Sequence, residues 1–143
     1  MALNNASVLM KTNLLVHKHL IVRAESKRPP KDEEHIVDWM REFVDSIGMK
    51  VLMGPYAKYL DVPGNRGLTV AAIIETSHIV MHTWDEPVPA LIQFDVYSCG
   101  EFDENDICKK IAKDFELTKI EYKYLNRETG LMDISGGILN YKK

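Results

Sequence analysis

The stretch 68-LTVAAIIETSHIVMHTW-84 decides the fold of this chain. It holds two short runs, Leu68–Ile74 and His78–Trp84, that are rich in β-branched and other apolar residues, as strands are. A third run of the same kind, Leu91–Cys99, follows a connection that contains two prolines. These runs predict a group of consecutive strands in one sheet, with polar residues at the turn between the first two.

Two amphipathic helices are predicted outside this group of strands. Asp32 can cap the first helix and Asp103 the second, because an aspartate side chain accepts hydrogen bonds from the free N–H groups of a first turn. Each helix then carries one apolar face, since its apolar residues recur at helical spacing. These residues are Ile36, Val37, Met40, Phe43, Val44 and Ile47 in the first helix, and Ile107, Cys108, Ile111 and Phe115 in the second. The remaining predicted strands are Asn13–Ala24, Met49–Leu60 and Leu117–Leu125.

This order of elements predicts an α+β fold. Two helices are expected to cover one face of a mainly antiparallel sheet, which gives a two-layer sandwich. A length of 143 residues suits a single domain over residues 1–143. Residues 1–12 are expected to form a loose arm and residues 126–143 an irregular tail, because neither segment shows a clear period.

The composition excludes several classes of protein. Charged residues make up 27% and hydrophobic residues 45%, as in soluble globular proteins. A net charge of −3 without a basic tract argues against nucleic acid as a partner. No apolar run approaches the roughly 20 residues that span a bilayer, and no secretory signal is evident at the start, so no membrane partner is expected. Cys99 and Cys108 form neither a disulfide framework nor a CxxC pair, which favours the cytoplasm.

Ser77, His82 and Cys99 are the candidate residues of one active site. A serine at a junction of strands can act as a nucleophile when a proton acceptor and oxyanion donors are near. Histidine suits proton transfer at neutral pH. Positions 77 and 82 differ in parity, so a flat strand would place these side chains on opposite faces. Either Ser77 lies outside the regular strand, or a bulge intervenes.

Resident cofactors are not expected from the residue pattern. His78 and His82 would lie about 13 Å apart along a strand, and no third metal ligand is evident, so no metal site is predicted. The chain also lacks a Gly-rich phosphate loop and a lysine context typical of pyridoxal phosphate.

Two paired motifs resemble a known family. SHIxxHTWxE at residues 77–86, followed by DxYSCG at residues 95–100, resembles the prokaryotic S-adenosylmethionine decarboxylase proenzymes. The resemblance runs from about Lys18 to about Leu125 and is dense between Thr69 and Gly100. It implies the same order of elements and an assembly of at least two copies, a homodimer or a higher homo-oligomer.

The resemblance also implies roles for individual residues. The chain would cut itself between Thr76 and Ser77, and Ser77 would become a covalent pyruvoyl group that forms a Schiff base with a small-molecule substrate. His82 would accept a proton during processing, and the hydroxyl groups of Thr69 and Thr76 would support that step. Cys99 would donate a proton to the substrate carbon after carbon dioxide leaves.

The implied function is pyruvoyl-dependent decarboxylation of S-adenosylmethionine for spermidine and other polyamine biosynthesis. The family commonly reads Glu-Ser-His at the cut, whereas this chain places Thr76 before the serine and its acid, Glu75, one residue earlier. Glu75 is the residue expected to contact the substrate. The segment 85–91 also departs from the family pattern.

These departures leave three alternatives open. The same scaffold could decarboxylate another amino acid, such as arginine or ornithine. A homologue could keep the fold and bind a partner or S-adenosylmethionine without cutting itself or acting as an enzyme. A thiol or metal enzyme that uses Cys99 and the histidines is the third.

Overall fold

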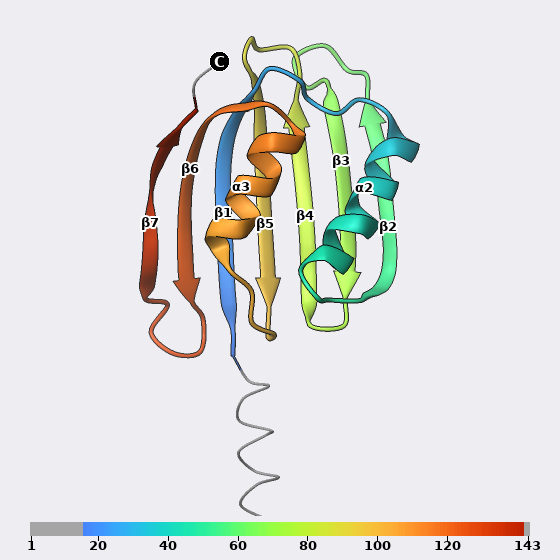
Figure 1. Cartoon of the computed structure of the whole chain (residues 1–143). Coiled ribbons are helices and arrows are strands. Elements are labelled where there is room, and N and C mark those ends of the chain that lie inside the picture. Colours follow the sequence, from blue (N-terminus) through green and yellow to red (C-terminus); the bar gives the residue numbers. More distant parts are fainter. Residues whose placement is uncertain (1–15, 142–143) are drawn as a thin grey trace, which may run out of the picture.

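Seven strands and two helices make up the computed structural model, which describes residues 16–141 (Figure 1). The strands are β1 (Lys18–Ser26), β2 (Val51–Leu60), β3 (Gly67–Ile74), β4 (Ser77–Trp84), β5 (Ala90–Ser98), β6 (Leu117–Asn126) and β7 (Asp133–Asn140). The helices are α2 (Glu33–Ser46) and α3 (Glu104–Asp114).

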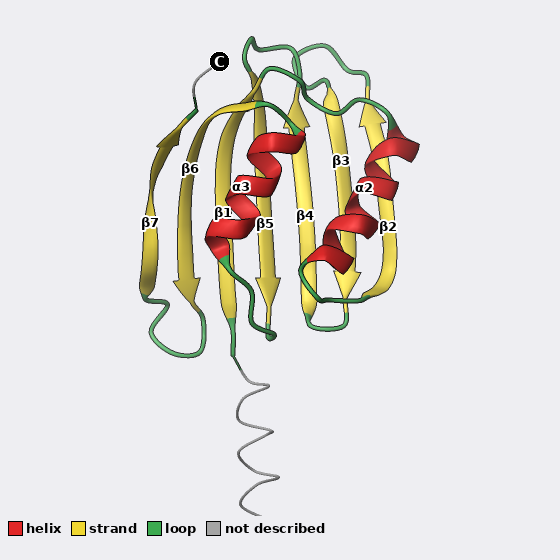
Figure 2. Cartoon of the chain, viewed as in Figure 1, coloured by secondary structure: helices red, strands yellow, loops and turns green. Residues whose placement is uncertain are grey.

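The strands form one antiparallel sheet in the order β2-β3-β4-β5-β1-β6-β7. Both helices lie on the same face of this sheet (Figure 2). The predicted two-layer α+β sandwich is therefore confirmed. The first strand along the chain, β1, pairs with β5 on one side and β6 on the other, so it lies inside the sheet rather than at an edge (Figure 1).

The strands of the sheet have one apolar and one polar face. In β5, for example, Ile92, Phe94 and Val96 are buried, whereas Gln93 and Asp95, which alternate with them, are not. Successive side chains of a strand point to opposite faces, so the buried set faces the helices and the other set lies on the face without helices. We call this second face the open face.

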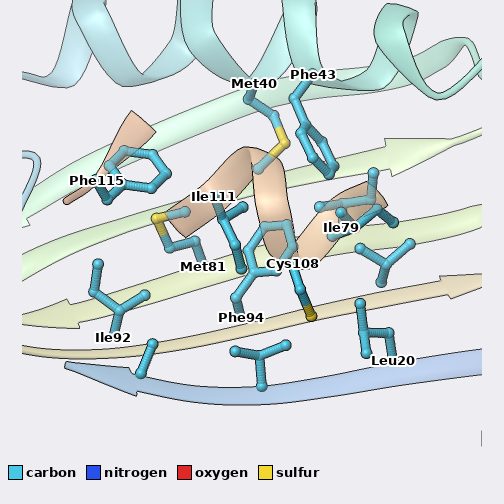
Figure 3. Close-up of a cluster of buried hydrophobic side chains, with 14 of the residues drawn as sticks. Leu20, Met40, Phe43, Ile79, Met81, Ile92, Phe94, Cys108, Ile111 and Phe115 are labelled. Atoms are coloured by element: carbon cyan, nitrogen blue, oxygen red, sulfur yellow. The ribbon is translucent and has the colours of Figure 1, made fainter. Parts of the chain in front are cut away.

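The helices begin as predicted and bury their apolar faces. Asp32 accepts a hydrogen bond from the His35 N–H at 2.8 Å, and Asp103 caps α3 in the same way. Figure 3 shows Phe43 of α2 beside Phe94 of β5, whose ring centroids are 5.5 Å apart at 85°. Such edge-to-face contacts between aromatic rings add to the free energy of burial.

Cys108 belongs to this core. Its side chain is 1% exposed, and burial raises the pKa of its thiol to about 11, so the group stays uncharged at neutral pH. The helix spacing had predicted this role. None of the helices within residues 16–141 is long and apolar enough to cross a membrane.

The C-terminal segment departs from the prediction. Residues 126–143 were expected to be an irregular tail, but they contain β7, which pairs with β6 from Lys119↔Asn140 to Leu125↔Asp133. β7 is an edge strand with mostly exposed side chains and two central glycines, so it carries no alternation of apolar and polar residues that would reveal it. The predicted arm at residues 1–12 lies outside the described residues, and the single domain stays a prediction.

Candidate active site

The turn between β3 and β4 contains a distorted backbone. Glu75 and Thr76 connect the two strands, and Ser77 begins β4 with a φ of 140°. A residue with a side chain rarely adopts a positive φ of this size, and such strain often marks a functional position. The pairing from Ile74↔Ser77 to Thr69↔His82 has no register shift, so a bulge does not separate Ser77 from His82. Instead, Ser77 itself departs from strand geometry.

The carbonyl group that precedes Ser77 is held by a main-chain donor. The Cys99 N–H donates to the Thr76 carbonyl oxygen at 2.8 Å. This is the carbonyl that the Ser77 hydroxyl would attack in a self-cleavage reaction. An N–H group already aimed at that oxygen stabilises the negative charge that develops on it, as an oxyanion hole does.

The side chain of Thr76 has a partner from the same segment. The Ser98 hydroxyl donates to Thr76 Oγ1 at 2.9 Å, and it accepts a hydrogen bond from the Gly100 N–H at 2.9 Å. Ser98 has no exposed surface. The end of β5 and the two residues after it therefore hold Thr76 through both its main chain and its side chain.

Cys99 lies beside the turn, since its N–H contacts Thr76. It is partly buried and forms no disulfide. The structure thus brings Ser77 and Cys99 to the same end of the sheet, with Thr76 between them. Glu75 is exposed, and its N–H donates to the Lys50 carbonyl at 2.9 Å. Its contact with a substrate stays a prediction.

His82 and Thr69 form a separate pair. Thr69 Oγ1 lies 2.9 Å from His82 Nδ1, and the two residues face each other across β3 and β4 on the open face. His82 is five residues along β4 from Ser77, which corresponds to about 17 Å of strand rise. A straight strand therefore separates Ser77 from His82 within one copy of the chain, and the site that combines them with Cys99 stays a prediction.

A network that the sequence did not predict lies on the open face. Asp95 Oδ2 is 2.8 Å from His19 Nε2 and 3.2 Å from His78 Nε2. Asp95 is the only charged residue within the apolar run of β5, and a part-buried charge needs partners. This lone charge in an apolar strand is the sequence feature from which the network could have been predicted. The partners, from β1 and β4, emerge only once the strand order is known.

The hydrogen-bond directions of this network follow from Arg127. Its guanidinium can only donate, and its Nη1 lies 3.3 Å from His19 Nδ1. Nδ1 therefore accepts, and the proton of the neutral ring is on Nε2, where it is donated to Asp95. The three side chains also place potential metal-ligand atoms within 4.8 Å of one another. The same atoms are already within hydrogen-bond distance of one another, so we describe the cluster as a hydrogen-bond network.

This network lowers the pKa of Asp95. Burial alone would raise the pKa, but the hydrogen bonds from His19 and His78 to the carboxylate outweigh it. A carboxyl group whose pKa is lower in the folded than in the unfolded state stabilises the fold above its unfolded pKa. That contribution disappears as the pH falls through the folded pKa.

We therefore expect Asp95→Asn to lower the free energy of unfolding by about 1–3 kcal/mol at pH 7, because it removes an ionised acceptor of two hydrogen bonds. The difference from wild type should begin to shrink below about pH 4, where the carboxyl of the unfolded chain becomes protonated, and should vanish only below the lowered pKa of the folded state. Urea unfolding at pH 7, 5 and 3.5 measures both effects. The exposed helix variant Asp38→Asn is the control, and an equal loss at all three pH values would contradict the expectation.

Sequence comparison assigns the family. Residues 18–128 match the sequence profile of the S-adenosylmethionine decarboxylase family. The chain belongs to the S-adenosylmethionine decarboxylase family. The predicted family is confirmed, and with it the class of enzyme, a carboxy-lyase whose relatives are named as proenzymes.

Individual relatives of this decarboxylase carry two different names. The S-adenosylmethionine decarboxylase proenzyme of Clostridium botulinum (strain Langeland) is 26% identical over 98 residues, which cover 68% of this chain and 79% of that protein. The arginine decarboxylase proenzyme of Ignicoccus hospitalis is 32% identical over 101 residues, which cover 69% and 67%. Among solved structures, a phage SAM lyase in complex with S-methyl-5'-thioadenosine matches with a TM-score of 0.43 and 9% identity, over 87% of this chain and 90% of that one.

Proposed function

We propose that this chain cuts itself between Thr76 and Ser77 and then decarboxylates S-adenosylmethionine for spermidine and polyamine biosynthesis in the cytoplasm. The observation that carries the proposal is the Thr76–Ser77 peptide. The backbone at Ser77 is strained, and the preceding carbonyl oxygen already accepts a hydrogen bond from the Cys99 N–H. A nucleophile next to a carbonyl with a preplaced donor is the arrangement that an acyl shift requires.

The self-cleavage step uses only groups of this chain and water. The Ser77 hydroxyl oxygen attacks the Thr76 carbonyl carbon, the peptide C–N bond breaks, and the released nitrogen takes up the proton, which leaves an ester. Loss of the Ser77 α-proton then breaks the bond between Cβ and the ester oxygen and frees Thr76 as a carboxylate. Water then hydrolyses the nitrogen from the residue that was Ser77, which releases ammonia and leaves the keto group of the pyruvoyl. The products are fragments of 76 residues and of 67 residues, since 143 − 76 = 67.

The residues at this turn suit a pyruvoyl group made in this way. When present, the group supplies an electron-accepting carbonyl, the role that pyridoxal phosphate has in other decarboxylases. Its position would be fixed by β4 on one side and by the segment after β5 on the other. The Cys99 thiol, which is partly buried beside it, would return a proton to the substrate carbon after carbon dioxide leaves.

We further propose that the working unit is a homodimer. His82 and Thr69 cannot reach Ser77 of the same chain along a straight strand, yet processing requires a proton acceptor. Their open face also exposes apolar side chains, such as Ile21 at 43% and Ile73 at 46%. Two open faces packed against each other would bury these side chains, and a second copy could then supply His82 to Ser77 of the first.

The second candidate substrate is arginine. The relative named arginine decarboxylase proenzyme shares more identity with this chain than the clostridial S-adenosylmethionine decarboxylase does, 32% against 26%. The acid before the cut is also displaced here to Glu75, which is exposed. Both observations concern substrate choice and leave the self-cleavage proposal unchanged.

The decisive experiment measures the mass of the freshly purified wild-type chain under denaturing conditions. We expect two fragments divided before Ser77, the second lighter by one ammonia than a fragment that starts with serine. Release of labelled carbon dioxide from S-adenosylmethionine, arginine and ornithine then identifies the substrate. An uncut chain after days of incubation would reject the proposal and favour a non-cleaving homologue. Cleavage with turnover of arginine alone would reject only the first substrate.

Cys99→Ala should separate processing from turnover. The variant keeps the main-chain N–H that contacts Thr76, so the chain should still cut itself. Loss of a proton donor should lower kcat by about 10²-fold or more. The matched control is Cys108→Ala, which removes a thiol from the core and should reduce stability without this loss of kcat. An unchanged kcat in Cys99→Ala would contradict the role of the thiol.

A further inference from the structure

Ser98 is a buried hydroxyl that the proposed mechanism does not yet use. It lies directly opposite Ser77 in the pairing of β4 with β5 and opposite Lys18 in the pairing of β1 with β5. Its oxygen accepts from the Gly100 N–H, and its proton is donated to Thr76 Oγ1, both at 2.9 Å. A buried hydroxyl needs hydrogen-bond partners. At the end of a strand, however, it can also find them in main-chain groups alone.

Ser26 shows the alternative within the same molecule. It ends β1 as Ser98 ends β5, and the two lie at opposite ends of the β1–β5 pair. Ser26 is 1% exposed and accepts from the N–H two residues later, that of Arg28, at 3.0 Å. Its proton goes to a main-chain carbonyl, that of Phe115, at 2.6 Å. The proton of Ser98 goes instead to a side chain next to the predicted cut.

We propose that Ser98 is a positioning residue for self-cleavage. By holding the Thr76 side chain, it fixes the rotation of the Thr76–Ser77 peptide, so that the carbonyl oxygen stays on the Cys99 N–H. This inference rests on the proposed self-cleavage and adds a residue to it. Ser98 acts through Thr76 and does not itself touch the reacting carbonyl group.

The geometry explains why such a residue is needed. Thr76 belongs to a two-residue turn, and a short turn next to a strained Ser77 can relax by rotating the peptide between them. The rotation would take the carbonyl away from its donor. Two anchors, one on the Thr76 carbonyl and one on its hydroxyl, oppose that rotation. Because reactions between neighbouring groups depend steeply on alignment, a displacement of about 1 Å can cost about 10²-fold in rate.

The first test compares cleavage rates of freshly synthesised chains on denaturing gels. Ser98→Ala should cut itself about 10²-fold more slowly than wild type. Ser98→Thr keeps the hydroxyl and should restore most of the rate. Ser26→Ala is the matched control and should cut at the wild-type rate, since it removes a buried hydroxyl that also accepts from the N–H two residues later but donates to a main-chain carbonyl far from the cut. Thermal unfolding of all three variants separates loss of rate from loss of fold.

The second test asks whether Ser98 acts through Thr76. Thr76→Val removes the acceptor and should slow cleavage as Ser98→Ala does. The double variant should then be no slower than either single variant, because both remove the same hydrogen bond. Losses that multiply in the double variant would overturn the proposal.

Hydroxylamine locates the step at which Ser98 acts. It attacks an ester and would release Thr76 as a hydroxamate, so it reports how much ester the chain forms. In Ser98→Ala, spontaneous and hydroxylamine-driven cleavage should fall by the same factor. Hydroxylamine-driven cleavage at the wild-type rate, or unslowed spontaneous cleavage in Ser98→Ala, would refute the positioning role and leave self-cleavage intact. A wild-type chain that never cuts would remove the basis of both.

Discussion

Replacing Ser77 with alanine should leave one uncut chain of 143 residues, with no carbonyl group that a hydrazide can label. Alanine removes the oxygen that attacks the Thr76 carbonyl, and no other step in the proposed reaction can start without it. The fold should survive, because Ser77 lies at the first position of β4 and outside the apolar core. Denaturing mass spectrometry and thermal unfolding measure the two outcomes.

Two further variants sharpen this expectation. Ser135→Ala, which removes a hydroxyl from β7, should cut like wild type. Ser77→Gly should also remain uncut, but it should be more stable than Ser77→Ala by about 1 kcal/mol, because glycine adopts a φ of 140° without strain. If the alanine chain still splits before residue 77, Ser77 is not the nucleophile. If glycine brings no gain in stability, the strain at this residue does not persist in solution.

Mixing two inactive variants should restore cleavage if the site is shared between copies. Ser77→Ala lacks the nucleophile, and His82→Ala lacks the proposed proton acceptor, so each should remain uncut alone. In a mixed dimer, His82 of the first variant can serve Ser77 of the second. We expect only the His82→Ala chain to be cut. Random pairing makes at most half of the dimers mixed, and only mixed dimers combine an intact Ser77 with an intact His82.

Coexpression with two different affinity tags, followed by denaturing mass spectrometry, identifies which chain is cut. The pair Ser77→Ala and Cys108→Ala is the control for mixing, since the second variant cuts itself in any case. A mixture that stays uncut would show that His82 does not act across two copies. Wild-type cleavage by His82→Ala alone would remove the residue from the mechanism, and a monomer in sedimentation would reject the dimer.

The sequence predicted most elements because their burial follows a period. α2 and α3 each place their apolar residues on one face, and both begin at the aspartates that were expected to cap them. The strands from β3 to β5 are rich in β-branched and other apolar residues, and turn residues bound them. β7 was not predicted, because an exposed edge strand with two glycines has no alternation of apolar and polar residues.

The site was predictable only in part, because its residues are far apart in the sequence and meet only through the order of the strands. Ser77 and Cys99 lie at ends of strands that are neighbours in the sheet, so a correct strand order brings them together. The chemistry of histidine and the resemblance both favour His82 as part of this site, whereas its parity and its five-residue separation from Ser77 place it elsewhere on a flat strand of the same chain. The contacts of Asp95 with His19 and His78 depend on β1 lying beside β5, which no local pattern reveals.

The position of β1 in the sheet also determines whether the two fragments stay together after a cut in the turn before β4. β1, β2 and β3 would belong to the first piece, and β4 to β7 to the second. Because β1 is hydrogen-bonded along both sides to strands of the second piece, the pieces are interlocked and would migrate together in any non-denaturing separation. Once unfolded, however, they would have to find each other again. The mature protein would therefore regain its structure at a rate that depends on concentration, whereas the uncut precursor folds as a single chain.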